Sequence, residues 1–148
     1  MDPGPVRVHL VPESTLQRRI FDLLGRWPQR LRLSLEHLPL KRGIVHWTPL
    51  PSYRRSLDDG ELLEATGVLQ HFPSGNLYIH TETSIHLGGC FRLAAADLER
   101  FILEHYERYG EDFFGIDPLL VSQEEPLLWT LHHEGLVGLL RGPPSPEG

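Results

Sequence analysis

The chain has 148 residues, a length that fits one domain able to bury a hydrophobic core without disulfides. Its 40% hydrophobic and 23% charged residues are typical of a globular protein. The single cysteine, Cys90, excludes an intramolecular disulfide and a cysteine-based zinc site, and favours a reducing compartment such as the cytoplasm. We expect neither a signal peptide nor a transmembrane helix, because no basic region precedes an apolar run and no window approaches 18 apolar residues.

Charge is distributed unevenly along the sequence. Residues 1–55 hold ten basic and four acidic residues, whereas residues 56–148 hold four basic and sixteen acidic residues. The formal net charge is −6. A net-acidic chain without a basic stretch interleaved with aromatic residues is a poor candidate for binding nucleic acid. The asymmetry indicates instead a surface of negative potential on the folded protein.

The N-terminal part of the chain predicts strands around one helix. Residues 6–10 alternate apolar and polar side chains, as a half-buried strand does. Ser14 opens a capping-box pattern before apolar residues at helical spacing, so we expect a helix over 14–24. Further strands are expected at 31–35 and 44–47, followed by a loop over 48–60 and by a stretch, 61–66, that fits a helical turn or a strand.

The middle of the chain predicts a hairpin and then the strongest helix. The hairpin pairs 68–72 with 77–81 across Pro73-Ser74-Gly75-Asn76, and a third strand is expected over 84–93. Residues 94–109 carry an apolar stripe at helical spacing, and Gly110 stands where a helix ends. After this helix, strands are expected at 119–121, 127–131 and 136–140, with a turn over 132–135.

Hairpin-like connections dominate this order of elements. We therefore predict an α+β fold, with a mainly antiparallel sheet and two main helices packed on one face. Residues 1–141 are expected to form a single domain. Residues 142–148 are rich in Pro, Gly and Ser, so a disordered C-terminal tail is predicted there.

The histidines offer several candidate sites, each with a structural alternative. Two imidazoles and a carboxylate in His132-His133-Glu134-Gly135 could contact a partner or a metal, but neighbouring residues on a strand diverge and the spacing is not that of H-E-x-x-H. We interpret the motif as a hairpin turn. Three more histidines, on the successive predicted strands, could form a metal site or a scattered surface set: His71, His80 and His86.

No catalytic residue, metal ligand or cofactor is assigned from the sequence. Cys90 stands four residues before a predicted helix rather than at its N-terminus, so nothing is expected to lower the pKa of its thiol, and a buried core position is predicted. Phosphate-binding glycine loops and paired-carboxylate motifs are absent from the sequence.

Acidic residues cluster at the end of the strongest predicted helix and just beyond it. Such a series is typical of a solvated helix face, and its alternative is a docking surface for a basic partner. The predicted partner-binding residues are these four acidic residues together with two from the late turn: Glu104, Glu107, Glu111, Asp112, His133 and Glu134.

The C-terminal half has an order of motifs found in one group of small bacterial proteins. Gly88-Gly89-Cys90-Phe91-Arg92 leads into the amphipathic helix 98–109, and Trp129-x-x-His132-His133-Glu134-Gly135 follows near the end. Over about residues 85–140 this order resembles the immunity proteins encoded beside polymorphic toxins, including the SUKH (Smi–Knr-like) group. The resemblance implies a non-enzymatic protein that masks a co-encoded toxin by surface complementarity.

Three functions remain open. The leading hypothesis is a non-enzymatic, cytoplasmic bacterial protein-binding domain, an immunity protein that neutralises a co-encoded toxin through an acidic surface. The second is a small metal-dependent or Cys/His hydrolase that uses residues from the set His80, His86, Cys90, His132, His133 and Glu134. The third is a structural homodimer formed through an exposed strand edge.

Overall fold

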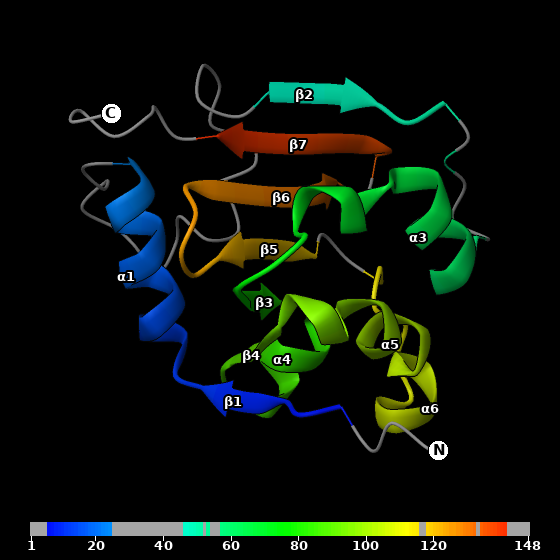
Figure 1. The fold of residues 1–148 in the computed structure, drawn as a ribbon. Coiled ribbons are helices and arrows are strands. Elements are labelled where there is room, and N and C mark those ends of the chain that lie inside the picture. The colour runs from blue at the N-terminus through cyan, green and yellow to red at the C-terminus, as the bar shows by residue number, and fades with distance from the viewer. Residues whose placement is uncertain are drawn as a thin grey trace.

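The computed structural model of the protein describes residues 6–24, 46–51, 53, 57–115, 118–132 and 134–141. The strand expected at 31–35 and the tail expected at 142–148 lie outside the described residues. Within the described residues, the structure contains one seven-stranded sheet and five α-helices (Figure 1).

The sheet is antiparallel throughout. Its strands are β1 (His9–Val11), β2 (His46–Pro49), β3 (Asn76–His80), β4 (Cys90–Ala94), β5 (Leu119–Ser122), β6 (Leu127–His132) and β7 (Leu136–Arg141). They lie in the order β1-β4-β3-β5-β6-β7-β2, and every neighbouring pair is antiparallel. The helices are α1 (Glu13–Leu24), α3 (Asp59–Thr66), α4 (Glu82–Leu87), α5 (Leu98–Leu103) and α6 (His105–Tyr109), with short 3₁₀ helices η2 (Val68–His71) and η3 (Ala95–Asp97). The predicted α+β class with a mainly antiparallel sheet is confirmed.

Helices cover both faces of the sheet, which corrects the expectation of one covered face. Side chains alternate along β3, so Leu77 and Ile79 join one hydrophobic core while Tyr78 joins the other. The first core includes residues of α3 and α5, and the second includes Leu16 and Ile20 of α1. Figure 1 shows α1 apart from α3, α5 and α6. Because β1 lies at the edge of the sheet, the helix that follows it, α1, can pack on either face of the sheet.

Several elements lie close to their predicted positions. Helix α1 begins at Glu13, one residue before the predicted start, and the strands expected at 6–10 and 44–47 are shifted towards their C-terminal ends. The last three strands and the turn between β6 and β7 are confirmed, with Gly135 at a φ of 86°. The helix expected over 94–109 consists of η3, α5 and α6 in succession, with a break at Glu104.

The predicted hairpin is wrong, and so is the long strand expected after it. Residues 68–71 form η2 rather than a strand, and β3 pairs instead with β4 and β5. Residues 84–87, the start of the strand expected over 84–93, belong to α4, so only the end of that stretch is a strand. The histidines His71, His80 and His86 therefore do not lie on three successive strands. Residues 59–66, assigned to a loop and an ambiguous segment, form α3.

Candidate functional site

Helix α4 is short but firmly defined at both ends. Thr81 caps it: the Oγ1 atom of Thr81 accepts a hydrogen bond from the backbone N–H of Ser84 at 3.2 Å, and Ser84 Oγ accepts one from the backbone N–H of Thr81 at 2.8 Å. Gly88 ends the helix with a φ of 87°, a conformation that favours glycine. The buried side chains of Thr83 and Ser84 face the protein. The other side of α4 is left to the solvent.

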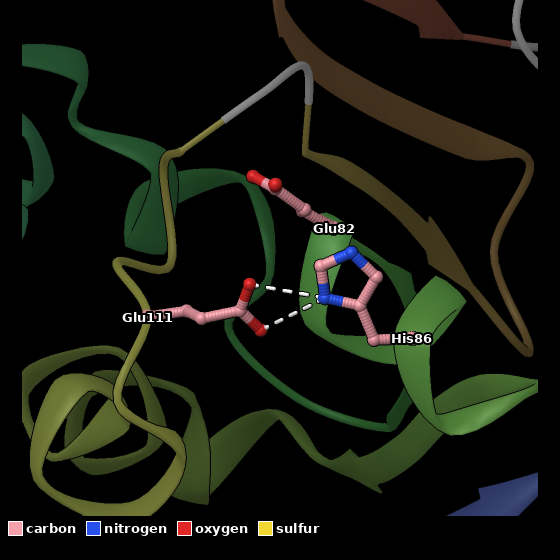
Figure 2. Close-up of side chains that lie close together, drawn as sticks. All are labelled: Glu82, His86 and Glu111. Carbon is pink, nitrogen blue, oxygen red and sulfur yellow. Dashed lines mark hydrogen bonds and ion pairs between the residues drawn. The ribbon is translucent and has the colours of Figure 1, made fainter.

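Two potential ligand groups lie one above the other on α4. Glu82 and His86 are separated by four residues, so a helix places them on the same face. The side chain of His86 is 58% exposed. Figure 2 shows both side chains directed towards the segment that carries Glu111.

Glu111 reaches this pair from the segment that follows α6. Gly110 ends α6 with a φ of 75°, and the next residue turns its carboxylate towards α4. His86 Nδ1 lies 3.0 Å from Glu111 Oε2 and 3.3 Å from Glu111 Oε1. The contact joins elements 25 residues apart in the chain.

The buried carboxylate of Asp59, in α3, holds the segment that follows α6 in place. Asp59 accepts hydrogen bonds from the backbone N–H groups of Phe113 at 2.7 Å and Phe114 at 3.1 Å. Burial raises the pKa of Asp59 above its ordinary value, and the two backbone hydrogen bonds oppose that rise. The position of Glu111 therefore depends on α3 as well as on α6.

Glu82, His86 and Glu111 together form a carboxylate–histidine cluster. Their ligand atoms all lie within 4.8 Å of one another. Such a group can hold a cation, and its carboxylates can accept protons or hydrogen bonds. Glu82 was not among the candidate residues from the sequence, and His86 was placed there on a strand. The four-residue spacing of Glu82 and His86 would have revealed the pair if the capping pattern at Thr81 had been read as a helix start.

A second contact joins α6 to α4 in the interior. The Nε2 atom of the fully buried His105 lies 3.0 Å from Thr83 Oγ1. Burial lowers the pKa of His105 to about 4, so its imidazole is neutral near pH 7. The ring is enclosed by four aromatic side chains, those of Phe91, Phe101, Tyr109 and Phe113. This histidine holds the two helices together rather than facing solvent.

The acidic residues predicted to bind a partner differ in whether a neighbouring cation compensates their negative charge. Glu104 forms ion pairs with Arg100 at 3.4 Å and Arg108 at 3.7 Å, so its charge is largely compensated. Glu111 faces His86. Glu107 and Asp112 are exposed, and within the described residues no ion pair involves either carboxylate. These two residues carry the uncompensated negative charge of the segment.

The late turn lies elsewhere in the sheet. Glu134 is exposed between β6 and β7, whereas α4 contacts β3 and β4, nearer the other edge of the sheet. The structure therefore does not bring Glu134 together with Glu107 and Asp112. His133 lies outside the described residues.

Exposed apolar side chains adjoin the acidic segment. Ile85 and Leu87 of α4 are 54% and 49% exposed, and Tyr106 of α6 is 61% exposed. Leu10 of β1 is 49% exposed and lies beside Gly89, just after α4. We define the α4–α6 surface as the exposed residues Leu10, Ile85, Leu87, Tyr106, Glu107 and Asp112.

The residues of the predicted hydrolase are divided between separate places. His80 Nε2 lies 3.1 Å from Glu13 Oε1 at the start of α1, and the Cys90 thiol also lies against this end of α1. Cys90 is fully buried, and burial raises the pKa of its thiol to about 12, so the thiolate is not accessible near neutral pH. The ring of His132 stacks edge-on against Trp47. His86 lies on α4, away from this set.

The comparisons with known proteins found no relative of this chain. No protein-family model matches it, and neither does any curated protein or solved structure. The evidence for the candidate site therefore comes from the geometry of this chain alone. No helix within the described ranges is both long and apolar enough to cross a membrane.

Proposed function

We propose that this chain is a non-enzymatic protein-binding domain of bacterial origin, which neutralises a co-encoded protein toxin through an acidic surface. The surface that we assign to this role is the α4–α6 surface. The resemblance of residues 85–140 to polymorphic-toxin immunity proteins supports the choice of partner.

The observation that carries the proposal is the combination of side chains on this surface. The neighbouring elements β1, α4 and α6 each expose apolar side chains, with the aromatic Tyr106 among them, and such exposure is typical of a protein–protein interface. Glu107 and Asp112 add exposed carboxylates that form no ion pair with a described residue. Carboxylates at the rim of an interface accelerate association with a basic partner and select against acidic ones.

The buried state of Cys90 also favours binding over catalysis. A cysteine nucleophile requires a thiolate, and the raised pKa of Cys90 opposes its formation. His80 approaches the same end of α1, but its Nε2 atom is engaged with Glu13. This pair therefore supports packing of α1 on the sheet.

The experiment uses the products of the genes that flank this one, purified separately and titrated into the full chain by calorimetry. We expect one basic product to form a 1:1 complex whose affinity falls as salt is raised. We also expect co-expression of the chain to restore growth of cells that produce this partner. If none of the flanking products binds, or if the chain only self-associates in sedimentation, the proposal is wrong.

A further inference from the structure

We propose that Glu82, His86 and Glu111 form a binding site for a divalent transition-metal ion, with Zn²⁺ as its best-fitting ligand. This inference concerns a different chemistry from the proposed protein binding and does not depend on it. It rests on the carboxylate–histidine cluster that α4 and the segment after α6 build together (Figure 2).

The donor atoms select the class of metal. The cluster offers one imidazole nitrogen and two carboxylates, a set that Zn²⁺ and its neighbours in the first transition row accept. Ca²⁺ and Mg²⁺ prefer sites made of oxygen ligands alone. The imidazole of His86 therefore favours Zn²⁺ over the two alkaline-earth ions.

The spacing of the donor atoms is close to that of a metal site. Ligands about 2.1 Å from a tetrahedral Zn²⁺ lie roughly 3.4 Å from one another. The donor atoms of the cluster lie within 4.8 Å of one another, and His86 Nδ1 is already 3.0 Å from a carboxylate oxygen of Glu111. The ligand atom of Glu82, which is half-buried at the start of α4, lies at most 4.8 Å from those of His86 and Glu111.

Backbone contacts around the cluster hold the segments that carry Glu82 and Glu111 in position. The capping box at Thr81 and Ser84 orients the first turn of α4, which carries Glu82. A Cβ atom placed on Gly115 would lie 3.2 Å from Glu82 Oε2, so the glycine leaves room for this carboxylate. Asp59 holds the backbone of Phe113 and Phe114, two and three residues beyond Glu111. The ligands from both segments are thus supported before an ion arrives.

Charge and access also fit a bound cation. Two carboxylates beside one imidazole provide negative charge that a divalent ion would compensate. The side chains of His86 and Glu111 are 58% and 30% exposed, so an ion can enter from solvent. Three protein ligands leave a fourth position for water or for a donor from another molecule.

The competing explanation is a surface ion pair without a metal. A protonated His86 beside Glu111 would also account for their 3.0 Å contact, and exposed pairs of this kind contribute little to stability. That explanation assigns no role to Glu82. Involvement of Glu82 in binding therefore separates the two explanations.

The test is calorimetric titration of the untagged full chain with ZnCl₂. We expect one ion per chain, and at least about 10-fold weaker binding in each of Glu82→Gln, His86→Ala and Glu111→Gln. Mg²⁺ and Ca²⁺ at the same concentration should not compete. His46→Ala, which removes an exposed histidine on β2, is the matched control and should bind Zn²⁺ as the wild type does.

A second measurement on the wild type locates the ion without any variant. Paramagnetic Co²⁺ added below one equivalent should first broaden the amide NMR signals of residues 82–87 and 110–115. Broadening that begins elsewhere would overturn the proposal. So would Zn²⁺ binding by the triple variant of Glu82, His86 and Glu111 that is as tight as that of the wild type, or no Zn²⁺ binding at all.

Discussion

His86 of α4 and Glu111 of the segment after α6 meet with 3.0 Å between Nδ1 and Oε2. The buried contact between Thr83 and His105 joins α4 to α6 itself in the interior. One contact faces solvent and the other faces the core, so α4 is connected on both sides to α6 and the segment that follows it. Their exposed side chains are thereby presented as one surface.

Removal of the Asp59 carboxylate should destabilise the protein. Asp59→Ala leaves the buried backbone N–H groups of Phe113 and Phe114 without their acceptor, so we expect the free energy of unfolding to fall by about 2–4 kcal/mol. Urea unfolding at neutral pH measures this. Asp58→Ala, which removes only the N-cap of α3, should cost about 1 kcal/mol. Equal losses in the two variants would contradict the anchoring role of Asp59.

Acid should weaken the fold through His105. The pKa of His105 is lowered to about 4 in the folded protein, whereas an unfolded histidine titrates near its ordinary value of about 6.5. Between these values the unfolded state binds more protons, so stability falls as pH is lowered through this window. The loss attributable to this residue approaches about 3 kcal/mol at pH 4. Urea unfolding at several pH values measures it.

His105→Gln serves as the comparison for this pH dependence. The variant is expected to be less stable at neutral pH, because the glutamine amide is poorly matched to the aromatic pocket of His105. Its stability should nevertheless change less than that of the wild type between pH 6.5 and pH 4. Asp59, whose raised pKa acts in the opposite direction, is present in both proteins and cancels in the comparison. Parallel pH profiles would show that His105 titrates normally in the fold.

Cys90 should be unreactive in the folded protein. Its thiol is fully buried and its pKa is raised to about 12, so a disulfide reagent such as DTNB should not label it at pH 8. In denaturant the same reagent should label one thiol per chain. Native labelling within seconds would contradict the buried position and would reopen the question of a cysteine nucleophile.

Gly115 offers a test of Glu82 that changes no charge. In Gly115→Ala the added Cβ atom would press on the Glu82 carboxylate, which lies 3.2 Å away. We expect a few-fold weaker Zn²⁺ binding and a modest loss of stability, because this glycine has an ordinary backbone conformation but the added Cβ atom would also lie 3.3 Å from the backbone oxygen of Asp112. Calorimetry with ZnCl₂ and thermal unfolding measure the two effects. Unchanged Zn²⁺ affinity would indicate that Glu82 is not a ligand.

The sequence predicted well the elements whose periodicity is supported by tertiary packing. The apolar residues of α1 and the stripe formed by Leu98, Phe101 and Ile102 face the core as their spacing indicates. Strands β5 and β6 are nearly continuous apolar runs and are buried along their length. In these segments local preference and burial favour the same structure.

The strand expected at 77–81 is β3, but the strand expected at 68–72 and the start of the one expected at 84–93 were predicted wrongly, because the structure of a short segment depends more on the residues at its ends than on its composition. Gly67 and Gly88, both at positive φ, end α3 and α4, whereas the sequence indicated a helical turn or a strand at 61–66 and placed Gly88 inside a strand. The capping box at Thr81 and Ser84 instead starts α4 within this stretch. The cluster with Glu111 could not be predicted at all, because its position depends on the long-range hydrogen bonds of Asp59.

The most direct test of the proposed function is the effect of charge reversal on the complex with the flanking gene product. We predict that the Glu107→Arg/Asp112→Arg double variant loses about 10- to 100-fold in affinity and most of the salt dependence. Glu64→Arg, which reverses an exposed carboxylate on α3, should bind as the wild type does. If the double variant keeps the wild-type affinity at low salt, the α4–α6 surface is not the binding site.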